Sequence, residues 1–347
     1  MNKDEKYLNH CLLLAKKGIR NVAPNPMVGC IIVHQNKIIG EGYHQKYGEA
    51  HAEVNAIHSV KDKSLLKKST LYVNLEPCSH FGKTPPCTGL IIKHLIPKIV
   101  IGCVDTFSEV SGKGITKLQD SGTEVVIGVL EKKSQQLNKR FFTFHNKKRP
   151  YIILKWAQTI NGFIDINREY KNPTIDNWIT NAYSKKLVHQ WRSEEQAILI
   201  GTNTALNDNP QLTVREVEGK NPLRVVLDLN LRLPKNLNIF DKSTPTLIIN
   251  AQKNELDINL EYAKVSKDLP LLNQILEELY KRKIQSIIVE GGAQLLNSFI
   301  AENLWDEAKI FIGEKEFKEG LKAPIIDKEP INSLQFDSDI LNTYLND

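Results

Sequence analysis

Apolar residues in the first third of the chain follow two patterns. Some recur every three or four positions, which predicts helices, and others form short runs between turn residues, which predicts strands. The predicted helices are Asp4–Lys17, His51–His58, Cys87–Leu95 and Ile115–Ser121. The predicted strands are Val28–Val33, Lys37–Tyr43, Thr70–Leu75, Lys98–Cys103 and Glu124–Gly128, the first two forming a hairpin. This alternation indicates an α/β sheet covered by helices.

The pattern changes near residue 148. The basic helical segment Gln135–Lys148 is followed by Pro150, which disfavours helix at the preceding residue, and then by a strand-rich region. We therefore predict two α/β domains, 1–147 and 148–347. Strands are predicted in the second at Tyr151–Ala157, Ala197–Gly201, Leu223–Leu227, Thr246–Asn250 and Ser286–Glu290, and helices at Ala182–Trp191, Pro270–Arg282 and Ala293–Glu302. The tail after Lys322 is weakly patterned.

The composition fits a globular two-domain protein. The 347 residues exceed one typical domain, and 41% hydrophobic and 25% charged residues are ordinary values. No apolar stretch approaches the ~20 residues that span a bilayer, and no secretory signal is visible. The net charge of +6 permits anionic ligands without requiring nucleic acid. We expect a cytoplasmic protein that binds neither membrane nor nucleic acid; the sequence leaves open whether it forms a homo-oligomer.

Two of the five cysteines differ from the rest in their surroundings. Cys11, Cys30 and Cys103 lie in apolar runs and are interpreted as small core residues. Cys78 and Cys87 lie instead in a polar, proline-rich segment after a predicted strand. An odd number of cysteines in a chain without a visible signal peptide does not indicate a disulfide framework.

One histidine and these two cysteines have the residue types of a catalytic zinc site. His51-Ala52-Glu53 opens a predicted helix, and one imidazole with two thiolates leaves a fourth zinc position for water. A nearby carboxylate, Glu53, can then carry a proton from that water to a leaving amine, as in zinc deaminases. Residues at i and i+2 face opposite sides of a helix, so this requires His51 at the helix start.

Two features leave alternatives open for this cluster. Eight residues separate Cys78 from Cys87, where zinc deaminases usually have two. A structural zinc would need a fourth protein ligand, for which His80 and His58 are nearby candidates. In a third alternative no metal binds, and the two cysteines and the histidine are ordinary loop and surface residues.

The segments 48–53 (GEAHAE) and 75–87 (LEPCSHFGKTPPC) closely resemble the bacterial bifunctional riboflavin-biosynthesis deaminase–reductase family. The resemblance implies a cytidine-deaminase-like three-layer N-terminal domain that deaminates a phosphorylated pyrimidine. It implies a single zinc ion on His51, Cys78 and Cys87, with Glu53 as the proton shuttle. The implied substrate contacts are Asn25, His44, His80, Lys83 and Asp105, although the family's Asp-Pro segment reads Asp105-Thr106 here.

The second half lacks the glycine fingerprint of a standard dinucleotide-binding fold. Instead, Gly291-Gly292 follows an apolar strand and opens a helix, an arrangement that suits a phosphate and is equally expected of a plain strand-to-helix turn. Lys155 lies inside an apolar strand, where a lysine is either functional or extends its amine toward solvent.

With Trp178–Thr180, Arg192 and the segment Gly201–Arg215, this region resembles the reductase half of the same family. The resemblance implies a dihydrofolate-reductase-like fold that uses NADPH, with Lys155 as catalytic residue. The implied cofactor contacts are Gln158, Trp178, Thr204, Asp208 and Gly292. The implied substrate contacts are Asp176, Arg192, Leu212, Arg215 and Glu290; the two arginines can hold a phosphate through paired donors.

One departure from the family lies at Asn161-Gly162, where its members commonly have Asp-Gly. We predict that Asn161 serves the turn, because Asn-Gly favours positive φ and the amide oxygen can accept from nearby backbone N–H groups. The alternatives to a fully active bifunctional enzyme are an enzyme with one active half, a nucleic-acid-editing deaminase with an appended binding domain, and a zinc-binding scaffold without activity. A low aromatic content of 7% disfavours the nucleic-acid reading.

Overall fold

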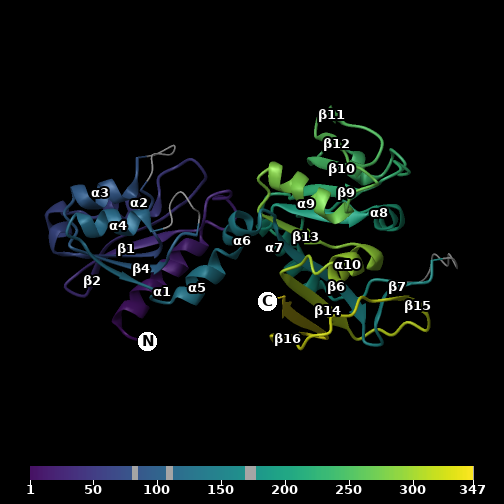
Figure 1. Ribbon diagram of the computed structural model, residues 1–347. Helices are drawn as coiled ribbons and strands as arrows, with labels where there is room; N and C mark the ends of the chain where they lie inside the picture. Colours follow the sequence, from purple (N-terminus) through teal and green to yellow (C-terminus); the bar gives the residue numbers. More distant parts are fainter. Residues whose placement is uncertain (80–84, 107–111, 169–176, 347) are drawn as a thin grey trace. The chain divides into compact units, whose positions relative to one another are not determined.

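The computed structural model describes residues 1–79, 85–106, 112–168 and 177–346. It divides into two compact units, Met1–Lys148 and Arg149–Asp347, each with its own sheet and core (Figure 1). Both units are mixed α/β, as the alternation of predicted helices and strands indicated.

The first unit is built on a five-stranded sheet with the order β2-β1-β3-β4-β5. Its strands are β1 (Gly29–His34), β2 (Lys37–Tyr43), β3 (Thr70–Leu75), β4 (Lys98–Cys103) and β5 (Glu124–Ile127). β1 pairs antiparallel with β2 and β3, whereas β3, β4 and β5 run parallel. Gln35 and Asn36 both have positive φ, as the two central residues of a type I′ hairpin turn require.

Helices cover both faces of this sheet and make a three-layer domain (Figure 1). The helices are α1 (Lys3–Lys16), α2 (Ala52–Ser59), α3 (Cys87–Lys93), α4 (Lys113–Asp120), α5 (Glu131–Leu137) and α6 (Lys139–Lys147), with a 3-10 turn at Lys63–Lys68. Ala56 of α2, Ile91 of α3 and Leu118 of α4 pack on one face of the sheet. Leu8 and Leu14 of α1 pack on the other. The cytidine-deaminase-like layering is thereby confirmed.

The second unit has a ten-stranded sheet with the order β11-β12-β10-β9-β8-β13-β6-β14-β17-β16. The strands from β12 to β14 in this order are parallel, and antiparallel strands flank them on both sides. They are β6 (Tyr151–Thr159), β8 (Ala197–Gly201), β9 (Leu223–Leu227), β10 (Thr246–Asn250), β11 (Glu255–Asp257), β12 (Leu260–Lys264), β13 (Ser286–Val289), β14 (Glu307–Gly313), β16 (Asn332–Phe336) and β17 (Asp339–Leu345). β7 (Phe163–Ile166) and β15 (Gly320–Lys322) form a separate pair.

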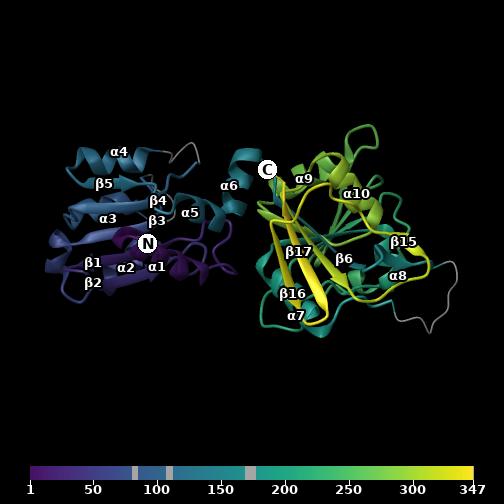
Figure 2. The same ribbon diagram turned by 90° about the horizontal axis from the view of Figure 1, so that it is seen from below.

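Helices again lie on both faces of the sheet (Figure 2). They are α7 (Ala182–Glu194), α8 (Thr202–Asp208), α9 (Leu271–Lys281) and α10 (Ala293–Ala301), with a 3-10 turn at Asn238–Phe240. Leu279 of α9 and Phe299 of α10 belong to the largest apolar cluster of this unit. Trp191 of α7 belongs to another cluster and stacks on Phe311 of β14, with ring centroids 5.5 Å apart.

Some elements differ from those predicted. The segment predicted as one helix, Gln135–Lys148, is two helices that meet at Asn138, whose side chain accepts from Met27 N (2.8 Å) and donates to Met27 O (2.9 Å). These bonds hold Asn138 outside helical geometry. Helix α8 and the strands β7, β11, β12 and β14–β17 were not predicted, because they are short or carry charged residues within the run.

The weakly patterned tail after Lys322 forms part of the main sheet. β17 pairs with β14 along its length, and β16 pairs with β17. Between these two strands the chain turns back, and buried Asp339 accepts hydrogen bonds from Asn181 N (2.8 Å) and Ser184 Oγ (2.5 Å). The tail therefore fixes the first turn of α7.

Candidate active sites

His51, Cys78 and Cys87 come from three segments that converge in the first unit. His51 is the N-cap of α2 with extended backbone, Cys78 lies in the segment after β3, and Cys87 is the first residue of α3. His51 Nδ1 lies 3.5 Å from Cys78 Sγ and 3.3 Å from Cys87 Sγ, and the three donor atoms lie within 4.8 Å of one another. The structure therefore brings together the three residues expected to hold zinc.

The chemistry of these donors fits a zinc ion. The hydrogen bond with Cys87, helped by His51, lowers the pKa of Cys78 to about 4, and burial opposes this effect. Cys78 Sγ also accepts from Cys87 N at 3.4 Å. A thiolate, a second sulfur and an imidazole nitrogen this close together form a donor set that zinc prefers. Among the described residues no fourth histidine, cysteine or carboxylate joins the group, so a structural four-ligand site is not formed there, and His58 is not part of it.

Glu53, the second residue of α2, is buried. Burial and the neighbouring Cys78 raise the pKa of Glu53 to about 7, and His51 opposes this effect. His51 precedes the first helical residue, so the objection that residues at i and i+2 diverge does not apply. A carboxyl group with a pKa near neutrality can both take up and release a proton.

Asn25 and His44 form a chain of hydrogen bonds beside the ligands. His44 Nδ1 lies 3.0 Å from Ala50 O, which can only accept, so Nδ1 carries the proton. His44 Nε2 therefore accepts from Asn25 Nδ2 at 3.1 Å. The His44 ring also contacts the His51 ring edge-on, with centroids 5.5 Å apart. Burial lowers the pKa of His44, which favours this neutral state.

Glu76 is a residue of this site that the sequence motifs did not single out. Its buried carboxylate accepts backbone N–H groups from Asp105 (3.3 Å), Gly112 (3.0 Å), Gly114 (2.9 Å) and Ile115 (3.3 Å). A Cβ at Gly114 would lie 2.3 Å from the carbonyl oxygen of Pro77, so this approach requires glycine. Glu76 thus ties the segment of Cys78 to Asp105 and to the start of α4.

The second unit contains a buried charge cluster at the end of β13. Arg192 of α7 donates through Nε (3.1 Å) and Nη2 (2.7 Å) to the two carboxylate oxygens of Glu290. Burial alone would raise the pKa of Glu290, but Arg192 and Lys155 outweigh it and bring the pKa to about 2. Burial lowers the pKa of Lys155 on β6, an effect that Glu290 opposes and Arg192 reinforces. These predicted residues therefore interact with one another.

Leu212 and Arg215 lie on a segment without regular structure near this cluster. Leu212 is buried with a φ of 56°, and Arg215 Nη1 donates to Thr213 Oγ1 at 2.7 Å. Thr213 O also lies 3.5 Å from Nη1 of Arg192. The expected substrate residues Arg192, Leu212, Arg215 and Glu290 are therefore in one neighbourhood.

Gly291 and Gly292 form a close turn between β13 and α10. A Cβ at Gly291 would lie 3.0 Å from Thr204 Oγ1, and Gly292 has a φ of 63°. Side chains at these positions would fill the space in front of the helix N-terminus, where free N–H groups suit a phosphate. This cradle fits the diphosphate of a nicotinamide cofactor and places Thr204 beside the expected contact Gly292.

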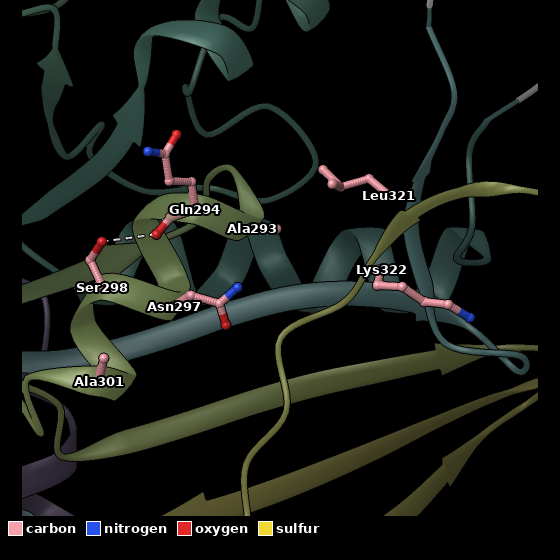
Figure 3. Close-up of a pocket in the computed structure, with 7 residues that line it drawn as sticks. All are labelled: Ala293, Gln294, Asn297, Ser298, Ala301, Leu321 and Lys322. Carbon is pink, nitrogen blue, oxygen red and sulfur yellow. Dashed lines mark hydrogen bonds between the residues drawn. The ribbon is translucent and has the colours of Figure 1, made fainter.

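A groove with a volume of about 640 Å³ lies next to this turn. Figure 3 shows Gln294, Asn297 and Ser298 on α10 and Lys322 on β15 at this groove, with Ser298 Oγ donating to Gln294 O at 3.0 Å. Its other lining residues are Ala293, Ala301 and Leu321. The ammonium of Lys322 extends away from α10 and lies over the ring of Phe163, 3.8 Å from its centroid (Figure 3).

Of the other expected cofactor contacts, Asp208 and Gln158 bind neighbouring side chains and Trp178 is exposed. Asp208 at the end of α8 pairs with Arg168 (2.6 Å), which also pairs with Asp165 of β7 (2.6 Å). Gln158 accepts from Trp156 Nε1 at 2.8 Å. The side chain of Trp178 is exposed. Arg168 belongs to no sequence motif, and only these contacts show that it lies beside the expected cofactor residue Asp208.

Asn161 contacts a distant segment as well as its own turn. Its Oδ1 accepts from Thr159 Oγ1 (2.7 Å) and from Phe317 N (3.3 Å), while its Nδ2 donates to Phe317 O (2.8 Å). Gly162, with a φ of 81°, supplies the positive φ of the turn. The backbone N–H group from which Asn161 Oδ1 accepts a hydrogen bond belongs to Phe317, which lies outside the turn, and not to a neighbour within the turn as predicted.

Three expected contacts, His80, Lys83 and Asp176, lie outside the described residues. Among the residues that are described, no helix combines the length and apolar character needed to cross a membrane.

These features define the class of protein: a zinc-dependent deaminase domain and a reductase domain in one chain. The family described as the cytidine and deoxycytidylate deaminase zinc-binding region matches residues 1–103, and the RibD C-terminal domain family matches residues 150–339. The chain belongs to the RibD family of bifunctional deaminase–reductase enzymes.

Relatives match over most of their length. The riboflavin biosynthesis protein RibD of Aquifex aeolicus is 41% identical over 92% of this chain and 89% of its own, and that of Escherichia coli is 33% identical over 90% and 88%. A Thermotoga maritima structure, described as a diaminohydroxyphosphoribosylaminopyrimidine deaminase/5-amino-6-(5-phosphoribosylamino)uracil reductase, has a TM-score of 0.87 at 37% identity and 98% coverage of both chains. Acinetobacter baumannii RibD has a TM-score of 0.88 at 30% identity, covering 99% and 98%.

Proposed function

We propose that this chain carries out two consecutive steps of riboflavin biosynthesis. The first unit deaminates a diaminohydroxyphosphoribosylaminopyrimidine. The second unit reduces the ribosyl group of the product, a 5-amino-6-(5-phosphoribosylamino)uracil, to a ribityl chain. The observation that carries the proposal is the convergence of His51, Cys78 and Cys87 beside the buried carboxyl group of Glu53.

In the deaminase, His51, Cys78 and Cys87 hold the zinc ion. When bound there, zinc would supply the Lewis acidity that makes a water molecule nucleophilic toward the ring carbon that bears the amino group. Glu53, buried beside the three ligands, takes a proton from this water and delivers it to the departing ammonia.

Other groups of the first unit position the pyrimidine. Asn25 has its Nδ2 directed to His44, which leaves its amide oxygen to accept from the pyrimidine. Asp105 contacts the substrate from the end of the segment that Glu76 holds. We assign His80 and Lys83 to the base and the sugar phosphate respectively.

In the reductase, the chain's own residues mainly orient the two reactants. NADPH supplies the hydride that reduces the sugar carbon. Gln158, Trp178, Thr204, Asp208 and Gly292 hold this cofactor. Lys155 hydrogen-bonds a sugar hydroxyl or assists ring opening at that carbon.

The polar groups of the substrate are bound by a further set of residues. Because Nε and Nη2 of Arg192 are committed to Glu290, we assign the main phosphate contact to Arg215. Asp176, Leu212 and Glu290 line the substrate side.

The direct test is to incubate the purified chain with the diaminopyrimidine substrate, with and without NADPH, and to identify the products by mass. We expect a gain of about 1 Da for deamination in either case and a further 2 Da only with NADPH, as the exchange of an amino group for oxygen and the uptake of two hydrogens require. Removal of zinc with a chelator should abolish the first change and leave reduction of supplied deaminated intermediate intact. Reduction without prior deamination would contradict the proposed order.

We further propose that the enzyme works in the cytoplasm on free metabolites. The modest net charge of +6 and the low aromatic content support small anionic substrates over nucleic acid. A binding titration with single-stranded RNA tests this point; saturable binding at physiological salt would contradict it.

A further inference from the structure

A buried histidine on α7 contacts the backbone of Arg215. His189 is 2% exposed and lies three residues before Arg192 on the same helix. Its Nδ1 lies 3.0 Å from the backbone nitrogen of Arg215. Because a backbone N–H can only donate, Nδ1 must be an unprotonated acceptor.

The segment that carries Arg215 has few backbone hydrogen bonds of its own. It belongs to no helix or strand, and side chains accept two consecutive backbone N–H groups: Asn221 Oδ1 from Val214 (2.8 Å) and His189 Nδ1 from Arg215. The conformation of Arg215 therefore depends on acceptors from other parts of the unit.

The surroundings of His189 keep its ring neutral. Burial and the positive charges of Arg192 and Arg215 lower the pKa of His189 to about 4, against the opposing charges of Glu216 and Glu290. At neutral pH the acceptor on Nδ1 is therefore available to the backbone N–H of Arg215.

We propose that His189 is a positioning residue of the reductase: its Nδ1 fixes the backbone of Arg215 so that the guanidinium meets the phosphate of the substrate. The inference rests on the proposed function of Arg215. It couples helix α7, which carries both His189 and Arg192, to the substrate-binding segment, so that one helix sets the position of both arginines.

Two substitutions of similar size separate this role from simple packing. The Oδ1 of asparagine reaches the position of histidine Nδ1, whereas the amide of glutamine reaches that of Nε2. We expect His189→Asn to retain the KM for the deaminated intermediate within about 3-fold. We expect His189→Gln and His189→Leu to raise it about 10-fold or more, because the part-buried backbone N–H of Arg215 loses its acceptor.

Separate measurement of KM and kcat distinguishes a loss of positioning from partial unfolding of the variant. Partial unfolding lowers the active fraction and therefore kcat, without raising the KM of the remaining enzyme. The KM for NADPH and the deaminase rate serve as internal controls and should not change. Hydrogen exchange of a peptide covering residues 212–216 should accelerate in the glutamine and leucine variants and remain slow in His189→Asn.

The variant Arg215→Gln distinguishes failure of this inference from failure of the proposed function. If Arg215→Gln raises the KM but His189→Leu does not, the positioning role is wrong while the phosphate contact stands. If neither changes the KM, both assignments are wrong. Equal behaviour of the asparagine and glutamine variants would also contradict the role of Nδ1.

Discussion

Two buried glutamates, one in each unit, have opposite electrostatic surroundings. Burial and the nearby Cys78 raise the pKa of Glu53 to about 7, whereas Arg192 and Lys155 overcome burial and bring the pKa of Glu290 to about 2. Glu290 is thus a fixed negative charge in the second unit, whereas Glu53 is the residue that we propose as the proton carrier of the deaminase. The comparison shows that the neighbours of a buried carboxyl group, more than burial itself, decide its chemistry.

Replacing each glutamate by glutamine should affect the two units in different ways. Glu53→Gln keeps the shape of the side chain but removes the proton carrier, so we expect deaminase kcat to fall by ~10²–10⁴-fold. Zinc content, measured by atomic absorption, and the reductase rate should match the unchanged protein. Full deaminase activity in this variant would show that another group moves the proton.

Glu290→Gln should act on stability as well as on reduction. It leaves the largely buried Arg192 and Lys155 without a counter-charge, which we expect to destabilise the second unit by about 3 kcal/mol. Urea unfolding followed by tryptophan fluorescence measures this effect, since all four tryptophans lie in the second unit. The deaminase rate should stay unchanged; an equally stable variant would mean that the pair contributes little net energy.

Lys155→Met tests the cationic partner of Glu290. Methionine has a similar length without the charge, so the strand should persist while reduction of the deaminated intermediate slows by about 10²-fold, as loss of a charge-assisted hydrogen bond permits. Deamination is the control. Unchanged NADPH oxidation in the presence of the intermediate would exclude a catalytic role for Lys155.

Asn161→Asp should have a small effect. The aspartate keeps the acceptor for Phe317 N but loses the donor to Phe317 O, which we expect to cost about 1 kcal/mol in stability. Reductase rates should stay within a few-fold. A large gain in rate would show instead that a negative charge matters at this position and that the second unit of this chain is impaired.

The last prediction concerns the pH dependence of stability. The pKa of His189 is about 4 when folded, below its ordinary value of about 6.5, so the unfolded chain binds a proton that the folded unit does not. The stabilisation by neutral His189 is complete above pH 6.5 and declines as pH falls toward 4. The charged groups facing it are Arg192, Arg215, Glu216 and Glu290. In His189→Asn, the slope of unfolding free energy against pH should be shallower in this window; an identical slope would contradict the assignment.

The sequence predicted the two sites to different extents. The zinc ligands lie in short motifs, and their residue types alone define a chemistry, so His51, Cys78 and Cys87 could be selected before their distances were known. The sequence alone could not select Glu76, Arg168 and His189. Their contacts are with backbone or charged groups of distant segments and produce no local pattern.

The fold shows the same limit. Long periodic helices and apolar strands were predictable, whereas β14 lies in the parallel part of the main sheet but carries Lys309 among its apolar residues. The side chain of Lys309 lies over the ring of Trp191, 4.2 Å from its centroid, a contact that only the assembled unit provides. Asn138 likewise divides a helical pattern through contacts with Met27, which is far away in the sequence.

The contact between Asp339 and the start of α7 has a consequence for the order of folding during synthesis. The first unit closes within residues 1–148, so all its strands are available while the second unit is still being made. The second unit needs β17, near its far end, to cover the edge of β14 and to bring Asp339 to Asn181 and Ser184. The deaminase can therefore fold while the chain is still on the ribosome, whereas the reductase is completed only after nearly the whole chain has emerged.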